Sequence, residues 1–532
     1  MQVSGVPLPG NVPLVLPIMR RLGIREKIDE LSPKRWDNGV TRGQAAEVVL
    51  ACILHSNGPL ALFRVKEYVS EWGLDVVLDL DATQLHDDKL GEMLDALVPM
   101  KEDKPDHSLV SELEQHCAHE AIAWLGLKPQ QVLFDFTRLE LSGAYEGAEL
   151  PRRGRGSGAH KQVQIGLNVL ADSGLPVLSR LHPGNANHTV NVPANLAELQ
   201  ARLPGRQLVV TTDAAGLCHD NIIAYNEAQM GFISPKPLTP AEEERMRSYP
   251  NPALEPLDYA PESGGRCWGL ETTWRLERQK HEEVLDVRVL IVRSQPLHRQ
   301  ERQQLVQDAR ALEQRLCDIR SYLNQNRYFE ERYARGQLEK ALEKHESGRF
   351  VSYCLSGSDG ALQLTWTMDY AALRAHARLL GRYVLFTNMP AEDYDASGLL
   401  RAYKSQHQVE ANFRQLKSEL HVAPVFLKKE RRVIALAALY ILALMIIAIL
   451  QFLACKARLK TRRGRDVTAR ELLRTYGAWT GVAIRVGTAR YIEPNPPTER
   501  QRAYLDALGF PEPDHWVAQH YRPPDHVRIP GR

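Results

Sequence analysis

Cysteine is scarce in this sequence. The seven cysteines among 532 residues are scattered, odd in number and never spaced as C-x-x-C. This distribution excludes a disulfide framework and a paired structural zinc site, and it is typical of reduced thiols in a cytoplasmic protein. Prolines at positions 7, 9, 13 and 17 interrupt the first apolar segment, so we expect no signal peptide.

An excess of charge of either sign is also missing. The chain has 67 basic and 65 acidic residues, which leaves a net charge of only +2. It therefore lacks a strong overall field toward nucleic acid, although the distribution of charge matters more than its total. Basic residues concentrate in residues 401–432 and 456–465. These clusters suit phosphate contacts, and they are equally compatible with charged side chains around an apolar helix.

Long apolar runs are missing except for one, VIALAALYILALMIIAIL at residues 433–450. Its 18 residues reach the usual length of a membrane span. A helix buried on all sides has the same pattern, and we favour it because no second run is comparable. We therefore expect no membrane association, with a membrane protein as an alternative. The chain is too long for one core, and two to four domains are expected.

The most informative residues that are present lie in LRAYKSQHQVEANFRQLKSEL, residues 400–420, which we predict to form one helix. Five side chains spaced by 3, 4, 4 and 3 residues share a face of it: Tyr403, Gln406, Glu410, Arg414 and Lys417. A carboxylate flanked by cations and a phenol suits a metal-bound phosphodiester. A solvated face with ion pairs between turns would give the same spacing.

Two aspartates upstream occupy positions typical of metal ligands. Asp135 interrupts the β-prone apolar run at residues 131–141, and a charge in a buried strand needs a partner or a metal ion. Asp213 directly follows a second run at residues 208–212, where open α/β sheets usually place their ligands. A turn or cap is the alternative role for Asp213.

Together, Asp135, Asp213 and Glu410 resemble the DDE triad of insertion-sequence transposases. The predicted helix resembles the signature Y-x2-R-x3-E-x6-K of one group, with Gln406 in place of the usual arginine. The likeness extends to FDFTRLELSG, to residues 161–190 and to VVTTDAAGL. The amino-terminal block VPLVLPIMRRLGIREKIDE resembles the extra helical domain of one branch of these enzymes.

This resemblance implies a DNA transposase that cuts at terminal inverted repeats and transfers the 3′ ends into target DNA. Three clustered carboxylates repel one another, and hard oxygen ligands select two Mg²⁺ or Mn²⁺ ions to relieve that repulsion. Asp135 would bridge both ions, while Asp213 and Glu410 would each hold one. Double-stranded DNA, a homodimer in the synaptic complex, and a bacterial cytoplasmic, nucleoid-associated location follow as expectations. A catalytically inactive DNA-binding descendant is the alternative.

Further positions are candidates for contact with the DNA backbone. Tyr403 and Lys417 would position the transposon end, with Arg414 in support, and Gln406 would bind phosphate more weakly than arginine. The glycine-rich, basic segment PRRGRGSGAHK contributes Arg152, Arg153 and Lys161. A hairpin tip without a ligand is the alternative for this segment.

The predicted fold class is α/β, with an RNase H-like core, a mixed α/β insertion and an all-helical N-terminal domain. We assign residues 1–125 to the helical domain, which binds DNA ends, dimerises or does both. The core comprises residues 126–235 and 396–455, in the order β-β-β-α-β-α-β. Residues 236–395 are the insertion, with strands and a helical hairpin, and residues 456–532 are a basic C-terminal region and a tail.

Overall fold

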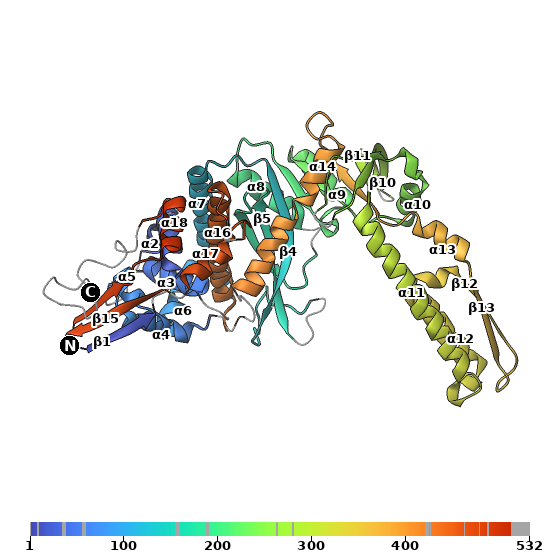
Figure 1. Cartoon of the computed structure of the whole chain (residues 1–532), viewed down its shortest axis with the longest axis horizontal. Coiled ribbons are helices and arrows are strands. Elements are labelled where there is room, and N and C mark those ends of the chain that lie inside the picture. The colour runs from blue at the N-terminus through green and yellow to red at the C-terminus, as the bar shows by residue number, and fades with distance from the viewer. Residues whose placement is uncertain are drawn as a thin grey trace. The chain divides into compact units, whose positions relative to one another are not determined.

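The computed structural model describes residues 2–7, 10–33, 39–55, 60–154, 160–187, 191–261, 264–278, 281–420, 425, 427–461, 463–477, 479–486 and 489–511. The chain forms two compact units, shown in Figure 1. The first contains Met1–Gly216, Asp220–Gly231 and Lys404–Arg532, and the second contains Leu217–His219 and Phe232–Tyr403. The predicted N-terminal segment and most of the predicted core fall in the first unit. Residues 217–219, 232–235 and 396–403 of the predicted core fall in the second unit, together with the predicted insertion.

The first unit begins with the helical segment expected from the sequence. Its helices are α1 Val12–Arg21, α2 Ile24–Leu31, α3 Arg42–His55, α4 Leu62–Glu71, α5 Leu74–Leu78, α6 Asp87–Leu97 and α7 Ser108–Leu125. The prediction that this segment is all-helical is wrong in detail. Gln2–Pro7 forms strand β1, and two short strands, Met100–Lys101 and Lys104–Pro105, pair with each other. Strand β1 pairs with β15, Thr480–Val486, and β15 pairs with β16, Ala489–Pro494. This partner lies too far along the chain for a local pattern to indicate it.

A mixed sheet in the first unit carries the order β6-β5-β4-β7. These strands are β4 Gln131–Leu141, β5 Lys161–Leu170, β6 Pro176–Pro183 and β7 Val209–Thr212. Strands β4 and β7 are parallel, whereas β5 is antiparallel to both β4 and β6. With α8 Val192–Arg202, α9 His219–Glu227 and β8 Gly231–Ser234, the observed order is β-β-β-α-β-α-β. The predicted α/β, RNase H-like fold is therefore confirmed.

Helix α16, Glu430–Lys456, contains the long apolar run. Every side chain from residue 433 to residue 450 is buried, and α16 contacts α1, α3, α6, α7, α17 and strand β6 (Figure 1). Among the described helices, it alone is long and apolar enough to cross a membrane, and its most apolar stretch is entirely covered by protein. The prediction of a helix buried on all sides is thus confirmed.

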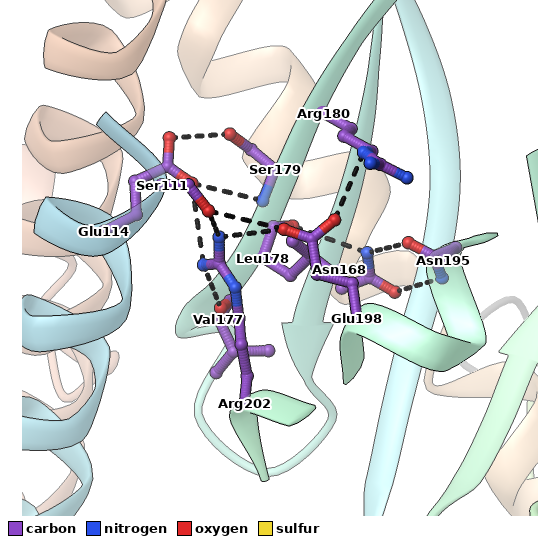
Figure 2. A network of polar contacts seen from close by, with 10 residues as sticks. All are labelled: Ser111, Glu114, Asn168, Val177, Leu178, Ser179, Arg180, Asn195, Glu198 and Arg202. Carbon is purple, nitrogen blue, oxygen red and sulfur yellow. Dashed lines mark hydrogen bonds and ion pairs between the residues drawn. The ribbon is translucent and has the colours of Figure 1, made fainter. Parts of the chain in front are cut away.

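A buried polar network joins α7 to the sheet, as Figure 2 shows. The carboxylate of Glu114 accepts hydrogen bonds from the Ser179 hydroxyl at 2.8 Å and from its backbone N–H at 3.3 Å. Arg202 lies 3.8 Å from Glu114 and 3.1 Å from Glu198, and its Nη2 donates to Ser111 at 2.7 Å. Every charge here has a partner, which a buried ionic group requires.

The second unit contains β9 Glu255–Pro256, β10 Cys267–Arg278, β11 His281–Ser294 and β14 Arg382–Thr387, with β11 paired to β10 and β14. Helices α11, Gln295–Tyr322, and α12, Glu331–Lys344, form the predicted hairpin. Their apolar stripe packs with strands β12, Val351–Ser356, and β13, Gln363–Met368, in a separate small core. Helices α10, Pro240–Ser248, and α13, Tyr370–Ala377, complete this unit.

The C-terminal region adds α17, Ala469–Tyr476, and α18, Glu499–Leu508, to the first unit. Thr498 caps α18 in a reciprocal pair of hydrogen bonds with Gln501. Strands β15 and β16 of this region pair with each other in antiparallel register. The predicted tail falls at residues 512–532, outside the described residues.

The Glu114 network predicts a pH-dependent effect of Glu114→Gln. Burial raises the pKa of Glu114 to about 7, against the opposing effects of Arg202 and Ser179. Because this pKa is raised on folding, the wild type loses stability as pH increases from about 4.5 to 7, whereas glutamine loses none. Between pH 5 and 8, the Gln variant should gain roughly 1–3 kcal/mol relative to wild type in thermal denaturation. Glu120→Gln, an exposed position on α7, should show no such trend.

Candidate active site

Asp135 lies within strand β4, between strands β5 and β7. It stands opposite Leu167 of β5 and is flanked by Phe134 and Phe136, whose rings contact each other edge to face. One oxygen of its carboxylate accepts a hydrogen bond from the Phe136 N–H at 2.7 Å. A carboxylate in this apolar strand meets the prediction that Asp135 occupies an electrostatically costly position.

Asp213 is the first residue after strand β7. The parallel register pairs Phe134 with Thr212, so the next residues along these strands, Asp135 and Asp213, follow at the same level of the sheet. The Asp213 Oδ1 accepts hydrogen bonds from the N–H groups of Ala215 at 3.1 Å and Gly216 at 3.2 Å. Asp213 therefore has the turn role considered from the sequence, and the register also brings it beside Asp135.

The single helix predicted for residues 400–420 is wrong. The chain forms α14, Ala396–Lys404, then a turn at Ser405 and Gln406, then α15, His407–Arg414, and finally a π-helical turn, Gln415–Glu419. At the break, the Ser405 hydroxyl accepts a hydrogen bond from Gln131 of β4 at 3.3 Å. The predicted stripe is thus interrupted, and Tyr403 belongs to a different unit from Glu410.

Helix α15 is fixed to the sheet by its apolar side and by one amide. Val409, Phe413 and Leu416 of the following turn are buried. The buried Asn412 donates a hydrogen bond to the Gly174 carbonyl at 3.1 Å, in the turn between β5 and β6. Glu410 is exposed on this anchored helix. Sequence patterns reveal the apolar side, but nothing in them identifies Asn412 as an anchor.

The three acids interact electrostatically. Burial, the largest cause, and the negative charges of Asp213 and Glu410 together raise the pKa of Asp135 to about 7, against the opposing effects of the Phe136 N–H and Lys417. Burial and the nearby Arg138 lower the pKa of Lys417, whereas Asp135 and Glu140 raise it. One cluster therefore brings together acids from β4, from the end of β7 and from α15.

Metal binding fits the chemistry of these three acids. Their donors are carboxylate oxygens only, the type that Mg²⁺ and Mn²⁺ prefer. Within the described part of the chain, the one set of three acid or histidine donors mutually within 4.8 Å is the exposed His86, Asp87 and Asp88. The three proposed ligands are thus more widely spaced than that, as expected for like charges that repel.

Comparisons with known proteins identify the family of this chain. A family model described as a transposase DDE domain matches residues 126–446, more than half of the chain. This chain belongs to that family. A domain of unknown function, DUF4277, matches residues 10–105. The chain is similar to a solved piggyBac transposase synaptic complex with hairpin DNA, at 9% identity and a TM-score of 0.40, over 90% of this chain and 82% of that one. A comparison with curated proteins gives no match.

The positions predicted to contact DNA are spread over this DDE transposase. Arg414 and Lys417 are exposed near Glu410, and Gln406 is half-buried at the start of α15. Tyr403 is half-buried on α14, with its ring centroid 6.0 Å from that of Tyr383. The Tyr403 contact therefore belongs to the second unit rather than to a stripe shared with Glu410.

The basic segment after β4 divides into two kinds of side chain. Arg152 and Arg153 are exposed, and Arg152 forms an isolated backbone bridge with Gln162. The Lys161 ammonium group donates hydrogen bonds to the carbonyls of Ala144 and, at 3.0 Å, of Tyr145. The Arg152 guanidinium also donates, to the carbonyls of Ala148 and, at 3.5 Å, of Pro151. Lys161 and Arg152 thus both bond to the loop, whereas Arg153 is exposed.

A basic group for which the sequence left phosphate contacts and packing around an apolar helix equally open has a structural role. Lys429, Arg431 and Arg432 surround Asp95 of α6 at 3.4, 2.8 and 2.9 Å. Burial raises the pKa of Asp95, but Arg432, Arg431 and Lys429 outweigh it, and the resulting pKa is lowered.

Sequence reasoning did not single out Arg138, which lies three residues after Asp135. The positive charge of Arg138 lowers the pKa of Lys417.

The electrostatic cost of the acid cluster predicts that Asp135→Asn stabilises the metal-free protein. Asparagine removes the buried charge and its repulsion with Asp213 and Glu410, so the Tm at pH 8 in EDTA should increase. Added Mg²⁺ should raise the Tm of the wild type but not that of the variant. An exposed control, Asp172→Asn, should behave as wild type in both conditions.

Proposed function

We propose that this chain is an insertion-sequence transposase of the Y-x2-R-x3-E-x6-K group. It cuts at terminal inverted repeats and transfers the resulting 3′ ends into target DNA. One observation carries the proposal: the negative charges of Asp213 and Glu410 both raise the pKa of Asp135, although the three residues come from β4, the end of β7 and α15. The family match supports the same conclusion independently.

In this proposal, the carboxylates of Asp135, Asp213 and Glu410 would together hold the divalent cations. Bound Mg²⁺ or Mn²⁺ would supply activation of a water or 3′-hydroxyl and stabilisation of the leaving oxygen. The register between β4 and β7 fixes the two aspartates relative to each other, and Asn412 holds the helix that carries Glu410. These contacts pre-organise the ligands, which limits the reorganisation needed at the reacting phosphate.

Positive side chains beside the acids would hold the DNA backbone. Lys417 lies close enough to Asp135 to lower the pKa of its carboxyl group, and the exposed Arg414 precedes Lys417 by three residues. Arg152 and Arg153 would extend this surface. Two ends must be paired for transposition, so we propose a homodimer on double-stranded DNA, in the bacterial cytoplasm and associated with the nucleoid.

The decisive experiment measures cutting of duplex DNA that carries the inverted repeats flanking this gene. Glu410→Gln should reduce the Mg²⁺-dependent cleavage rate by roughly a thousandfold or more, because it removes a proposed metal ligand. DNA binding in EDTA should remain close to wild type, and Asp172→Asn should retain both activities. Cleavage by the Glu410→Gln protein at a near wild-type rate would remove the catalytic assignment. Binding without cutting by the wild type would favour an inactive, transposase-derived DNA-binding protein.

Gln406 provides a second test, because it replaces the arginine of the signature. Gln406→Arg adds a cation at the start of α15 and should retain or raise end cleavage. If the new arginine contacts a phosphate, the slope of log affinity against log salt should steepen by about 0.9. A loss of cleavage with unchanged binding would show that Gln406 has no phosphate role at this turn.

A further inference from the structure

A groove of about 620 Å³ lies between helices α11 and α13, entirely within the second unit. Arg302 and Arg310 line it from α11, and Arg374 and Arg378 line it from α13 or its C-terminal end. Figure 1 shows both helices. The groove has a single acidic lining residue, Glu313. Four arginines against one glutamate is a marked local excess in a chain whose net charge is only +2.

These four arginines form no ion pairs with the described residues. In the described part of the chain, Arg302, Arg310 and Arg378 have no side-chain partner, and Arg374 donates only to the Tyr370 carbonyl at 3.0 Å. All four are exposed. Unpaired guanidinium groups on both sides of a groove indicate an anionic ligand.

The acids next to the groove on α11 are already used elsewhere. Glu301 accepts a hydrogen bond from the Gly381 N–H at 2.6 Å. Asp308 accepts hydrogen bonds from the Ser347 N–H at 2.8 Å and hydroxyl at 2.7 Å, and it pairs with His345 at 2.7 Å. Neither acid is therefore directed to the arginines, which keeps the groove positive.

We infer that this groove binds the phosphodiester backbone of duplex DNA, as a second contact separate from the proposed catalytic acids. The inference rests on the proposed function, because it concerns the same DNA. Arg302 and Arg310 are eight residues apart on one helix, about 12 Å along its axis, so each can meet a different phosphate. Leu305, Ala309 and Ala377 also line the groove, and their apolar side chains suit contact with deoxyribose.

The test measures binding rather than catalysis. The full-length Arg302→Gln/Arg310→Gln protein is titrated with a fluorescent duplex of about 30 base pairs, in EDTA and over a range of salt concentrations. Removal of two phosphate contacts should lower the magnitude of the log–log salt slope by about 2 and weaken binding roughly tenfold near 0.1 M salt. Circular dichroism should remain that of wild type, since both side chains are exposed and unpaired.

A matched control is available on the same unit. Arg327→Gln/Arg332→Gln removes the same charge from two exposed arginines that do not line the groove. It should leave affinity and slope nearly unchanged. Equal losses in the two double variants would overturn the assignment, because they would reflect net charge alone.

Two other outcomes are also decisive. Unchanged DNA binding by Arg302→Gln/Arg310→Gln would exclude the groove as a DNA site while leaving the catalytic proposal intact. Unchanged DNA binding combined with loss of self-association would identify the groove as a protein-docking site for an acidic helix. Failure of the wild type to bind any duplex would instead contradict the proposed function.

Discussion

The candidate site depends on an unfavourable arrangement of charge: a largely buried carboxylate held close to two others. Burial and the acidic neighbours raise the pKa of Asp135 to about 7. Bringing the ionised acids together therefore lowers the free energy of unfolding. The surrounding structure must therefore be rigid enough to resist repulsion. The parallel register of β4 and β7 provides part of that rigidity, and the docked side of α15 provides the rest.

Two buried acids near the sheet, Glu114 and Asp135, differ in how the electrostatic cost of burial is offset. Glu114 is completely enclosed, but serine donors and Arg202 surround it, which makes it a structural connection between α7 and β6. Asp135 has a backbone donor from Phe136 and is otherwise influenced mainly by like charges. A buried acid supplied with protein partners connects two elements of the fold, whereas a buried acid facing other acids indicates a place for external cations.

Local sequence patterns predicted the elements that depend on local chemistry. The β-prone apolar run around Asp135 correctly predicted strand β4, and the predicted helical hairpin of the insertion is the α11–α12 pair. They failed where distant segments decide. Ser405, at the break between α14 and α15, bonds to Gln131 of β4, and the cations Lys429, Arg431 and Arg432 pair with Asp95 of α6. Gln131 and Asp95 are distant in sequence from the residues they contact, so no local sequence pattern indicates these contacts.

The placement of α16 has a consequence for biosynthesis. Helices α1, α3, α6 and α7 leave the ribosome early, yet the apolar surface that they pack against is encoded more than 300 residues after the last of them. At about 5–20 residues per second, they wait tens of seconds for it. Until then the nascent N-terminal segment exposes surface that aggregates readily, so chaperone protection during translation matters more for this chain than its helical content suggests.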